Sequence, residues 1–233
     1  MNPDGVMLIT GTRTGIGAFL ARHYAALGWH VIGCSRQEPD WHVPNYEHHL
    51  LDVGDEKAMI ALFQKIRARH GRLDAAINNA GIATMNHVML TPASTVDRIM
   101  RTNVIGSFVV AREAAKLMVA GKTGRIVNFS TVAHPLNLEG EAAYAASKAA
   151  VESLTRIMAR EFAPWNITVN ALGPTPIDTD LIRGVPADKM KSLLERLPSG
   201  NLGNMSQVAH VIDFFLAPGS SCITGQVLYL GGV

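Results

Sequence analysis

The chain has 233 residues, of which 48% are hydrophobic and 17% charged, with a formal net charge of +2. This composition is typical of a globular protein with enough apolar material for one large core. The 21 basic and 19 acidic side chains nearly balance and form no basic run, which argues against binding to nucleic acid or to a membrane surface.

The N-terminal segment gives no sign of export or of a membrane anchor. It is acidic and short before its first apolar run, unlike a signal peptide. No apolar run in the sequence approaches the ~20 residues needed to span a bilayer. We therefore expect a cytoplasmic protein.

Seven apolar segments alternate with helical patterns along the chain. Between these segments, apolar residues recur at three- and four-residue spacing, which predicts helices near 15–28, 55–70, 93–119, 141–163 and 206–216. The expected strands are 6–10, 30–34, 48–53, 73–78, 125–130, 167–172 and 226–230. Several of them are almost continuously apolar, which indicates parallel strands covered by helices on both faces. The sequence therefore predicts an α/β fold with a doubly wound parallel sheet, in one domain over residues 1–233.

A glycine-rich turn follows the first predicted strand, with the sequence TGTRTGIG from Thr10 to Gly17. Gly11, Gly15 and Gly17 let the backbone turn sharply and let a pyrophosphate approach the N-terminus of the next helix. Free amide groups and the helix dipole there favour an anion. The spacing differs from G-x-G-x-x-G, so this segment alone leaves open a glycine turn without a ligand.

The second predicted strand runs into Ser35 and Arg36, about twenty residues after the glycines. In sheets that bind NAD, an acidic side chain at this corner contacts the ribose 2′-hydroxyl. Here a hydroxyl and a guanidinium take its place, and both suit a 2′-phosphate. Arg13, inside the glycine turn, is a second source of positive charge. We expect NADP(H) as the cofactor, and the alternative for Arg36 is a solvated surface side chain.

Three later segments complete a recognisable set of motifs. They are NNAG at 78–81, RTNVIGSF with Asn103, and YAASK from Tyr144 to Lys148. With the glycine turn, and in order and spacing over essentially the whole chain, they resemble the motifs of the short-chain dehydrogenase/reductase family. The resemblance implies a Rossmann-type fold, a nicotinamide cofactor and an oxidoreductase activity.

The resemblance assigns roles to residues that match the family's motifs. Asn103 would position a water in a proton relay, and Asn79 and Gly81 would line the cofactor cleft. Asp52 would accept from the adenine amino group beside Val53, with a helix N-terminal anion as the alternative. The expected cofactor-binding residues are Gly11, Arg13, Thr14, Gly15, Ile16, Gly17, Ser35, Arg36, Asp52, Val53, Asn79, Ala80, Gly81, Tyr144, Lys148, Pro174, Ile177 and Thr179.

Tyr144 and Lys148 lie one helical turn apart and therefore share a helix face. A free tyrosine has a pKa of about 10, and a nearby ammonium favours the phenolate and lowers that pKa. The resemblance implies that Tyr144 protonates the carbonyl oxygen during reduction. It also implies that Lys148 holds the nicotinamide ribose and tunes Tyr144.

The hydroxyl that bonds the substrate oxygen is expected just after the fifth strand. Family spacing back from Tyr144 selects Thr131, where a serine is usual, and Ser130 precedes it. Consecutive side chains at a strand end point to opposite faces, so only one of the two hydroxyls is expected to reach the substrate. A one-residue slip in favour of Ser130 stays open. His134 borders the expected pocket and is a further candidate for substrate contact.

The segment after the sixth predicted strand departs from the family pattern, because Pro-Thr-Pro at 174–176 replaces Pro-Gly. The second proline biases Thr175 toward extended geometry, so we expect a nicotinamide wall of a different shape. Ile177 and Thr179 still match the positions that would touch the carboxamide. The polar stretch 174–204 is too long for a simple crossover and predicts a lid.

The sequence as a whole predicts an enzyme that moves hydride between NADP(H) and a ketone or secondary alcohol. The chain ending ITGQVLYLGGV most resembles 3-oxoacyl-carrier-protein reductases, which implies a 3-oxoacyl thioester. Lys122 lies where such enzymes present a basic group to an acidic carrier, but the companion position is Trp165. A small-molecule ketone, sugar or polyol therefore stays open, as does a catalytically silent NADP-binding regulator. The family implies a homotetramer or homodimer, and the cysteine and histidine spacing indicates no metal.

Overall fold

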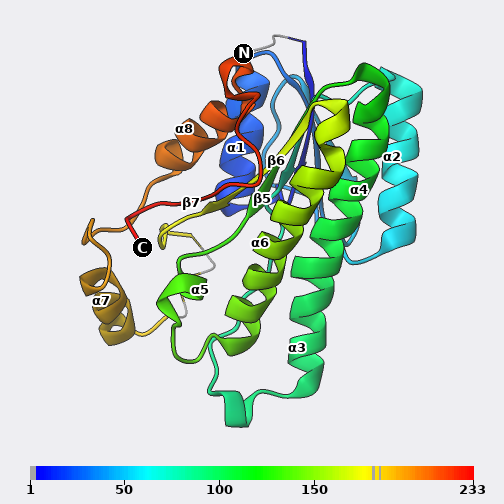
Figure 1. Cartoon of the computed structure of the whole chain (residues 1–233). Helices are drawn as coiled ribbons and strands as arrows, with labels where there is room; N and C mark the ends of the chain where they lie inside the picture. Colours follow the sequence, from blue (N-terminus) through cyan, green and yellow to red (C-terminus); the bar gives the residue numbers. More distant parts are fainter. Residues whose placement is uncertain (1–3, 180–181, 184) are drawn as a thin grey trace.

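Seven parallel strands form the central sheet of the computed structural model, which describes residues 4–179, 182–183 and 185–233 (Figure 1). The strands are β1 (Val6–Thr10), β2 (His30–Ser35), β3 (Tyr46–Leu50), β4 (Ala75–Asn78), β5 (Gly124–Phe129), β6 (Ile167–Gly173) and β7 (Val227–Tyr229). They lie in the order β3-β2-β1-β4-β5-β6-β7. The strand order reverses between β1 and β4, where open α/β sheets bind ligands at the carboxyl ends of their strands. The predicted Rossmann-type fold class is confirmed.

Helices cover both faces of this sheet (Figure 1). The helices on one face are α1 (Gly15–Ala26) and α8 (Met205–Leu216), and those on the other are α2 (Glu56–His70), α4 (Gly106–Met118) and α6 (Ala142–Phe162). Smaller helices lie below the sheet in Figure 1, namely α3 (Ala93–Met100), α5 (Ala133–Leu136) and α7 (Ala187–Glu195). None of the helices in the described part of the chain has the length and hydropathy needed to cross a bilayer.

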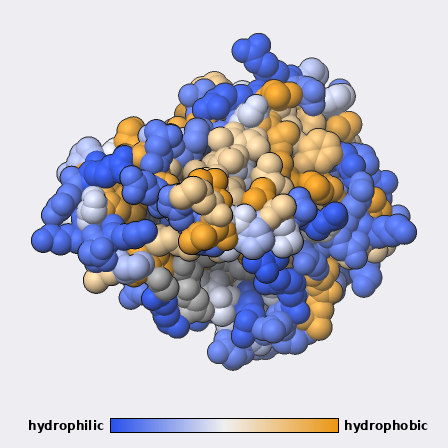
Figure 2. All heavy atoms as spheres, turned by 90° about the horizontal axis from the view of Figure 1, so that it is seen from below, coloured by the Kyte–Doolittle hydropathy of each residue, from blue (hydrophilic) through white to orange (hydrophobic). Residues whose placement is uncertain are grey.

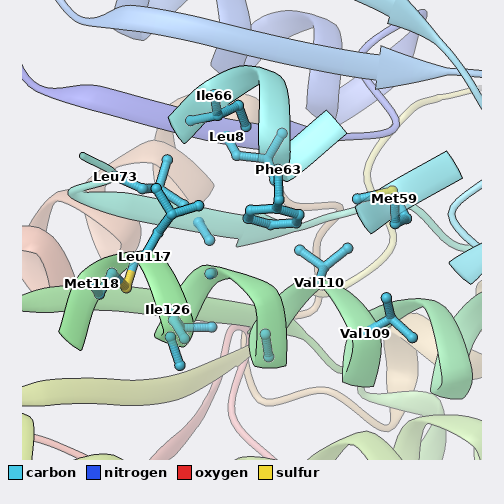
Figure 3. Packing of buried hydrophobic residues seen from close by; sticks show 14 of the residues in the cluster. Leu8, Met59, Phe63, Ile66, Leu73, Val109, Val110, Leu117, Met118 and Ile126 are labelled. Atoms are coloured by element: carbon cyan, nitrogen blue, oxygen red, sulfur yellow. The ribbon is translucent and has the colours of Figure 1, made fainter. Parts of the chain in front are cut away.

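The strands divide their apolar side chains between two cores, because neighbouring residues point to opposite faces. Leu8 faces the core beneath α2 and α4, whereas Met7 and Ile9 face the core beneath α1 and α8. Figure 3 shows Phe63 of α2 and Val110 of α4 meeting in the first of these cores. Each such side chain stabilises the fold by about 1.5–3 kcal/mol relative to exposure. Because both faces are buried, each side chain must face its own core, and this fixes the register between neighbouring strands.

Two elements differ clearly from the sequence prediction. The helix predicted at 93–119 is α3 and α4 joined by a wide π turn, η2 (Arg101–Ile105). One extra residue in a turn leaves the apolar spacing on either side intact, so the pattern could not reveal it. The strand predicted at 48–53 begins earlier, at Tyr46, and ends at Leu50. The stretch 174–204, predicted as a lid, contains α7.

Candidate active site

The glycine turn leads from β1 into α1 and leaves the N-terminus of that helix open. Gly15 has a φ of 60°, in the left-handed region that favours glycine. An added Cβ at Gly17 would lie 2.2 Å from the carbonyl oxygen of Gly11 and 2.5 Å from Nδ2 of Asn79. α1 has no acidic residue in its first turn and no side-chain cap from Thr14. Its first amide groups are therefore available to a dinucleotide pyrophosphate.

The corner beyond β2 forms one end of a groove along the carboxyl edge of the sheet. Arg13, Ser35 and Arg36 line the same cavity of about 580 Å³. The two guanidinium groups give this end positive charge, and the Ser35 hydroxyl adds a polar group between them and the sheet. The residues that we expect to bind a 2′-phosphate therefore lie around one cavity.

Asp52 lines the same cavity, next to Val53. Its Oδ1 accepts from the backbone amide of Gly54 at 2.8 Å. The N-terminus of α2 is capped instead by Asp55, whose side chain accepts from Ala58. Asp52 is therefore not the anion of that helix N-terminus, which leaves the adenine contact as its expected role.

Asn79 ties the loop after β4 to the glycine turn. Its Nδ2 donates to the carbonyl oxygen of Thr10 at 2.9 Å, and the amide of Ala80 donates to the Thr10 hydroxyl at 3.0 Å. Gly81 follows, and an added Cβ there would lie 3.4 Å from Nζ of Lys148. The loop therefore forms a thin wall between the glycine turn and α6.

Asn103 is fully buried in the η2 turn. Its Oδ1 accepts from the amide of Ile82 at 2.9 Å, and its Nδ2 donates to the Ile82 carbonyl at 3.0 Å and to the Ser147 hydroxyl at 2.9 Å. π turns of this kind are frequent at functional sites. The side chain of Asn103 nevertheless holds the loop after β4 against α6 and lines none of the three cavities of the groove.

α6 brings Tyr144 and Lys148 to the floor of the groove, as their spacing predicted. Lys148 is buried, and its Nζ donates to the carbonyl oxygen of Phe129 at 2.8 Å. The same Nζ lies 5.9 Å from the centre of the Tyr144 ring. Thr131, buried at the end of β5, lines the cavity beside Tyr144 and accepts from the amide of Ala133 at 3.2 Å.

The protonation of Tyr144 differs from the sequence prediction. Burial raises the pKa of Tyr144 to about 12, against a smaller opposite effect from its hydrogen bond with Thr131, while Glu141 adds to the rise. Lys148 was expected to lower this pKa, but the effects that shift it are those of burial, Thr131 and Glu141, and burial has the largest effect. Burial also lowers the pKa of Lys148 to about 8. Near neutral pH the site therefore holds a protonated phenol beside a lysine that is still mostly charged, which is the state needed to give a proton to a carbonyl oxygen.

A buried carboxylate, Glu152, lies two turns beyond Tyr144 on the same face of α6. Its Oε1 accepts from the Ser130 hydroxyl at 2.5 Å and from the Tyr229 hydroxyl, and it lies 3.1 Å from Nδ1 of His134. Burial alone would raise the pKa of Glu152, but the hydrogen bonds from Ser130, Tyr229 and His134 outweigh it and lower the pKa. The ionised carboxylate therefore joins the segment that follows β5 to the last residue of β7.

We expect Glu152→Ala to lower the free energy of unfolding by about 1–3 kcal/mol for each buried hydroxyl left without an acceptor. Because folding lowers the pKa of Glu152, its carboxylate stabilises the fold above the ordinary glutamate pKa. That contribution is lost as the pH falls through the folded-state pKa, so the difference between the two proteins should shrink in acid. Urea unfolding at several pH values measures this difference in the free energy of unfolding. Glu161→Ala, at an exposed position of the same helix, is the control, and equal stability of the two variants would contradict the assignment.

Beyond Tyr144 the groove continues into a cavity of about 390 Å³, within the size range of small-molecule sites, which we call the wide cavity. Its walls come from the carboxyl ends of the strands and from segments around α5 and α7. The apolar lining includes Met85, Leu138, Val185, Met190 and Leu193, and the charged lining is mixed, with Lys189 and Arg196 together with Glu139 and Glu141. Figure 2 views the molecule from this side and shows apolar residues near the middle of the face with hydrophilic residues around them.

Most of the predicted site residues lie along this one groove. Adjoining cavities share Gly11, Thr14, Ala80 and Gly81 at one junction and Ile16, Tyr144, Pro174 and Thr179 at the other. Ile177 lines the wide cavity, and Ser130 lines the cofactor part of the groove rather than the substrate part. Gly17 and His134 line none of the three cavities. Gly17 lies beneath the glycine turn, and His134 is turned toward Glu152.

Sequence reasoning missed two parts of the site. Glu152 lies four residues after Lys148 and eight after Tyr144, so helical spacing could have placed it on the same face. Lys189 and Arg196 on and after α7 were read only as part of a polar loop. Their place in the cavity wall depends on α7 folding back toward α5, where Arg196 donates to the carbonyl oxygen of Leu136.

This fold, with a glycine turn opening onto a dinucleotide groove and a Tyr-Lys pair at its floor, defines a Rossmann-type nicotinamide oxidoreductase. The family model for enoyl-(acyl carrier protein) reductase matches residues 11–232. The 3-oxoacyl-[acyl-carrier-protein] reductase FabG of Escherichia coli (strain K12) is 32% identical, over 100% of this chain and 98% of the relative. The chain belongs to the short-chain dehydrogenase/reductase family, whose members interconvert CH–OH and C=O groups.

Two further relatives show the range of substrates and cofactors at this level of similarity. The NAD-dependent glycerol dehydrogenase of Listeria innocua is 32% identical, over 98% of this chain and 93% of the relative. The gluconate 5-dehydrogenase of Burkholderia cenocepacia, solved in complex with NADP and tartrate, has a TM-score of 0.91 and 30% identity, over 98% of this chain and 94% of that chain.

Proposed function

We propose that this protein is an NADPH-dependent reductase of ketones, with a 3-oxoacyl thioester as the favoured substrate class. The observation that carries the proposal is the groove itself. It joins a doubly basic corner at Arg13 and Arg36 to the Tyr144–Lys148 pair, and then to a largely apolar cavity. A bound nicotinamide cofactor supplies the hydride in this chemistry.

The residues of the chain supply the other parts of the reaction. Tyr144 gives its proton to the carbonyl oxygen as hydride arrives at the carbon, and the Thr131 hydroxyl donates a hydrogen bond to the same oxygen. Lys148, held by the carbonyl of Phe129 at 2.8 Å, orients the nicotinamide ribose. Pro174, Ile177 and Thr179 border the groove at the carboxamide end.

A 3-oxoacyl thioester fits the cavity because its acyl chain can cover apolar side chains. Lys189 and Arg196 offer positive charge to an anionic carrier group, although Glu139 and Glu141 line the same cavity. The FabG relatives act on carrier-bound substrates by name. Lys122 and Trp165, however, precede β5 and β6 at the amino ends of these strands, at the opposite edge of the sheet from the cavity. A polyol or sugar substrate is the second candidate, favoured by the similarity to the glycerol and gluconate dehydrogenases.

Steady-state oxidation of NADPH with a panel of ketones tests the proposal. The panel consists of a 3-oxoacyl thioester of coenzyme A, a simple aliphatic ketone and a keto sugar. We expect the thioester to be reduced with the highest kcat/KM. Turnover of the keto sugar alone would favour the second candidate. Binding of NADPH without turnover of any carbonyl would instead indicate a catalytically silent regulator.

We expect the enzyme to prefer NADPH over NADH by roughly 10–150-fold, because one charged hydrogen bond to the 2′-phosphate contributes about 1.5–3 kcal/mol. Arg36→Ala should erode this preference, chiefly through the KM for NADPH. Measured KM values for both cofactors test it, with Arg22→Ala on the outer part of α1 as a control for lost positive charge. Equal catalytic efficiency with the two cofactors in the unmodified enzyme would contradict the assignment.

A further inference from the structure

A chain of hydrogen bonds lies directly behind Ser35 and connects three segments of the protein. The Thr12 hydroxyl lies 2.8 Å from the Tyr46 hydroxyl, and the Tyr46 hydroxyl lies 2.6 Å from Nδ1 of His48. Nε2 of His48 lies 3.0 Å from the Ser35 hydroxyl. Gly33 makes room for this chain, since an added Cβ there would lie 2.2 Å from the Tyr46 oxygen.

The donor and acceptor of every hydrogen bond in this series follow from one hydrogen bond whose direction is certain. The Ser35 hydroxyl lies 2.7 Å from the carbonyl oxygen of Gln37, and a carbonyl can only accept, so Ser35 donates there. The Ser35 oxygen must therefore accept from Nε2–H of His48. In a neutral ring Nδ1 then accepts, so Tyr46 donates to it. Burial raises the pKa of Tyr46 to about 12, which keeps that hydroxyl protonated.

We infer that His48 is a positioning residue that sets the preference for NADP(H) by acting on Ser35, an inference that rests on the proposed cofactor. When the Ser35 proton turns from Gln37 to a 2′-phosphate, the hydrogen bond from His48 remains. A hydroxyl that accepts a hydrogen bond becomes a stronger donor, because hydrogen bonds in a chain polarise one another. NAD(H) has only a hydroxyl at the ribose 2′ position, so it gains less from the stronger donation by Ser35.

The same geometry makes the preference depend on pH. Burial lowers the pKa of His48, and the nearby His49 acts in the same sense, whereas Glu38 and the backbone of Gln37 act in the opposite sense. Arg13 and Arg36 line the same cavity as Ser35. A bound phosphate dianion favours the charged ring and raises the pKa of His48. Binding of NADPH should therefore take up a proton as the pH falls, and the preference for NADPH should rise.

The test measures the dissociation constants of NADPH and NADH directly, by nicotinamide fluorescence, so that no substrate is needed. The variants are His48→Ala, which removes the donor, and His48→Gln, whose amide can still donate to Ser35 but cannot titrate. His49→Gln is the matched control, because His49 lies next in the strand and bonds Glu47 at 2.9 Å instead. Each protein is measured at about pH 6 and about pH 8, on either side of the histidine range.

We expect His48→Ala to lower the ratio of the NADH to the NADPH dissociation constant by about 3–10-fold, the worth of one neutral hydrogen bond. His48→Gln should keep the ratio near pH 8 and lose the rise toward pH 6. The 2′-phosphate of free NADPH also gains a proton near pH 6. That titration belongs to the free cofactor and is the same in every experiment, so the difference between proteins isolates His48.

Three results would overturn the inference. An unchanged ratio in His48→Ala would show that Ser35 does not depend on the ring. Equal weakening of NADH and NADPH would show a general structural role. A similar loss in His49→Gln would show that any change in this strand has the effect. Equal binding of both cofactors by the unmodified protein would instead refute the proposed cofactor preference itself, and with it the basis of the inference.

Discussion

Replacing Tyr144 by phenylalanine should lower turnover by about 10²–10⁴-fold, the usual worth of a positioned general acid. The phenol lies at the junction of the cofactor groove and the wide cavity, where the proposed mechanism needs a proton donor. Its pKa, raised to about 12 chiefly by burial, keeps the proton in place until the carbonyl oxygen gains charge. Phenylalanine keeps the ring and the shape of the groove, so the loss should appear in kcat.

The binding of NADPH to Tyr144→Phe separates a catalytic from a structural role. Fluorescence titration should give a dissociation constant close to that of the unmodified protein, because Lys148 and the glycine turn are intact. Loss of NADPH binding together with turnover would point to a collapsed groove. Turnover close to that of the unmodified enzyme would remove Tyr144 from the mechanism.

Replacing Thr131 by valine should lower turnover by about 10²–10³-fold, as removal of a hydrogen bond to a developing oxyanion usually does. Thr131 lines the wide cavity, whereas the neighbouring Ser130 is turned away and donates to Glu152 at 2.5 Å. Valine has nearly the shape of threonine and keeps the packing at the end of β5. The missing hydroxyl is therefore the main difference.

Two further variants decide between the neighbouring hydroxyls. Thr131→Ser should stay active, because it keeps the donor and removes only a methyl group. Ser130→Ala should lose far less turnover than Thr131→Val, although it should lose some stability because Glu152 loses one of its hydrogen bonds. Turnover measured in the reverse order would assign the substrate hydroxyl to Ser130.

The alternation of apolar runs and helical spacing was enough to predict the sheet, because parallel strands buried on both faces must be apolar throughout. Tyr144, on α6, could be placed only through its motif and its helical spacing to Lys148. The glycine turn, Ser35 and Arg36 could be placed because each stands next to the carboxyl end of a strand. All such residues meet at one edge of a parallel sheet.

Other features of the site depend on contacts between distant segments, which the local sequence pattern cannot predict. Glu152 is a charged residue in an otherwise ordinary helix, and only the fold brings Ser130 and Tyr229 to it. The pKa of Tyr144 is the sum of burial and charge effects with opposite signs, and their balance depends on how tightly the site is packed. His48 could be read as a strand residue but not as the neighbour of Ser35.

The π turn at Arg101–Ile105 should make this helical segment more sensitive to the insertion or deletion of a residue than to substitutions. An α-helix turns by about 100° for each residue. Deleting one residue within the turn would close it and rotate α3 against α4 by about that angle. Either Ile99 or Val109, both buried, would then swing toward solvent. Substitutions at the exposed Arg101 and Ile105 should be accepted far more readily than a deletion or an insertion of a single residue between them.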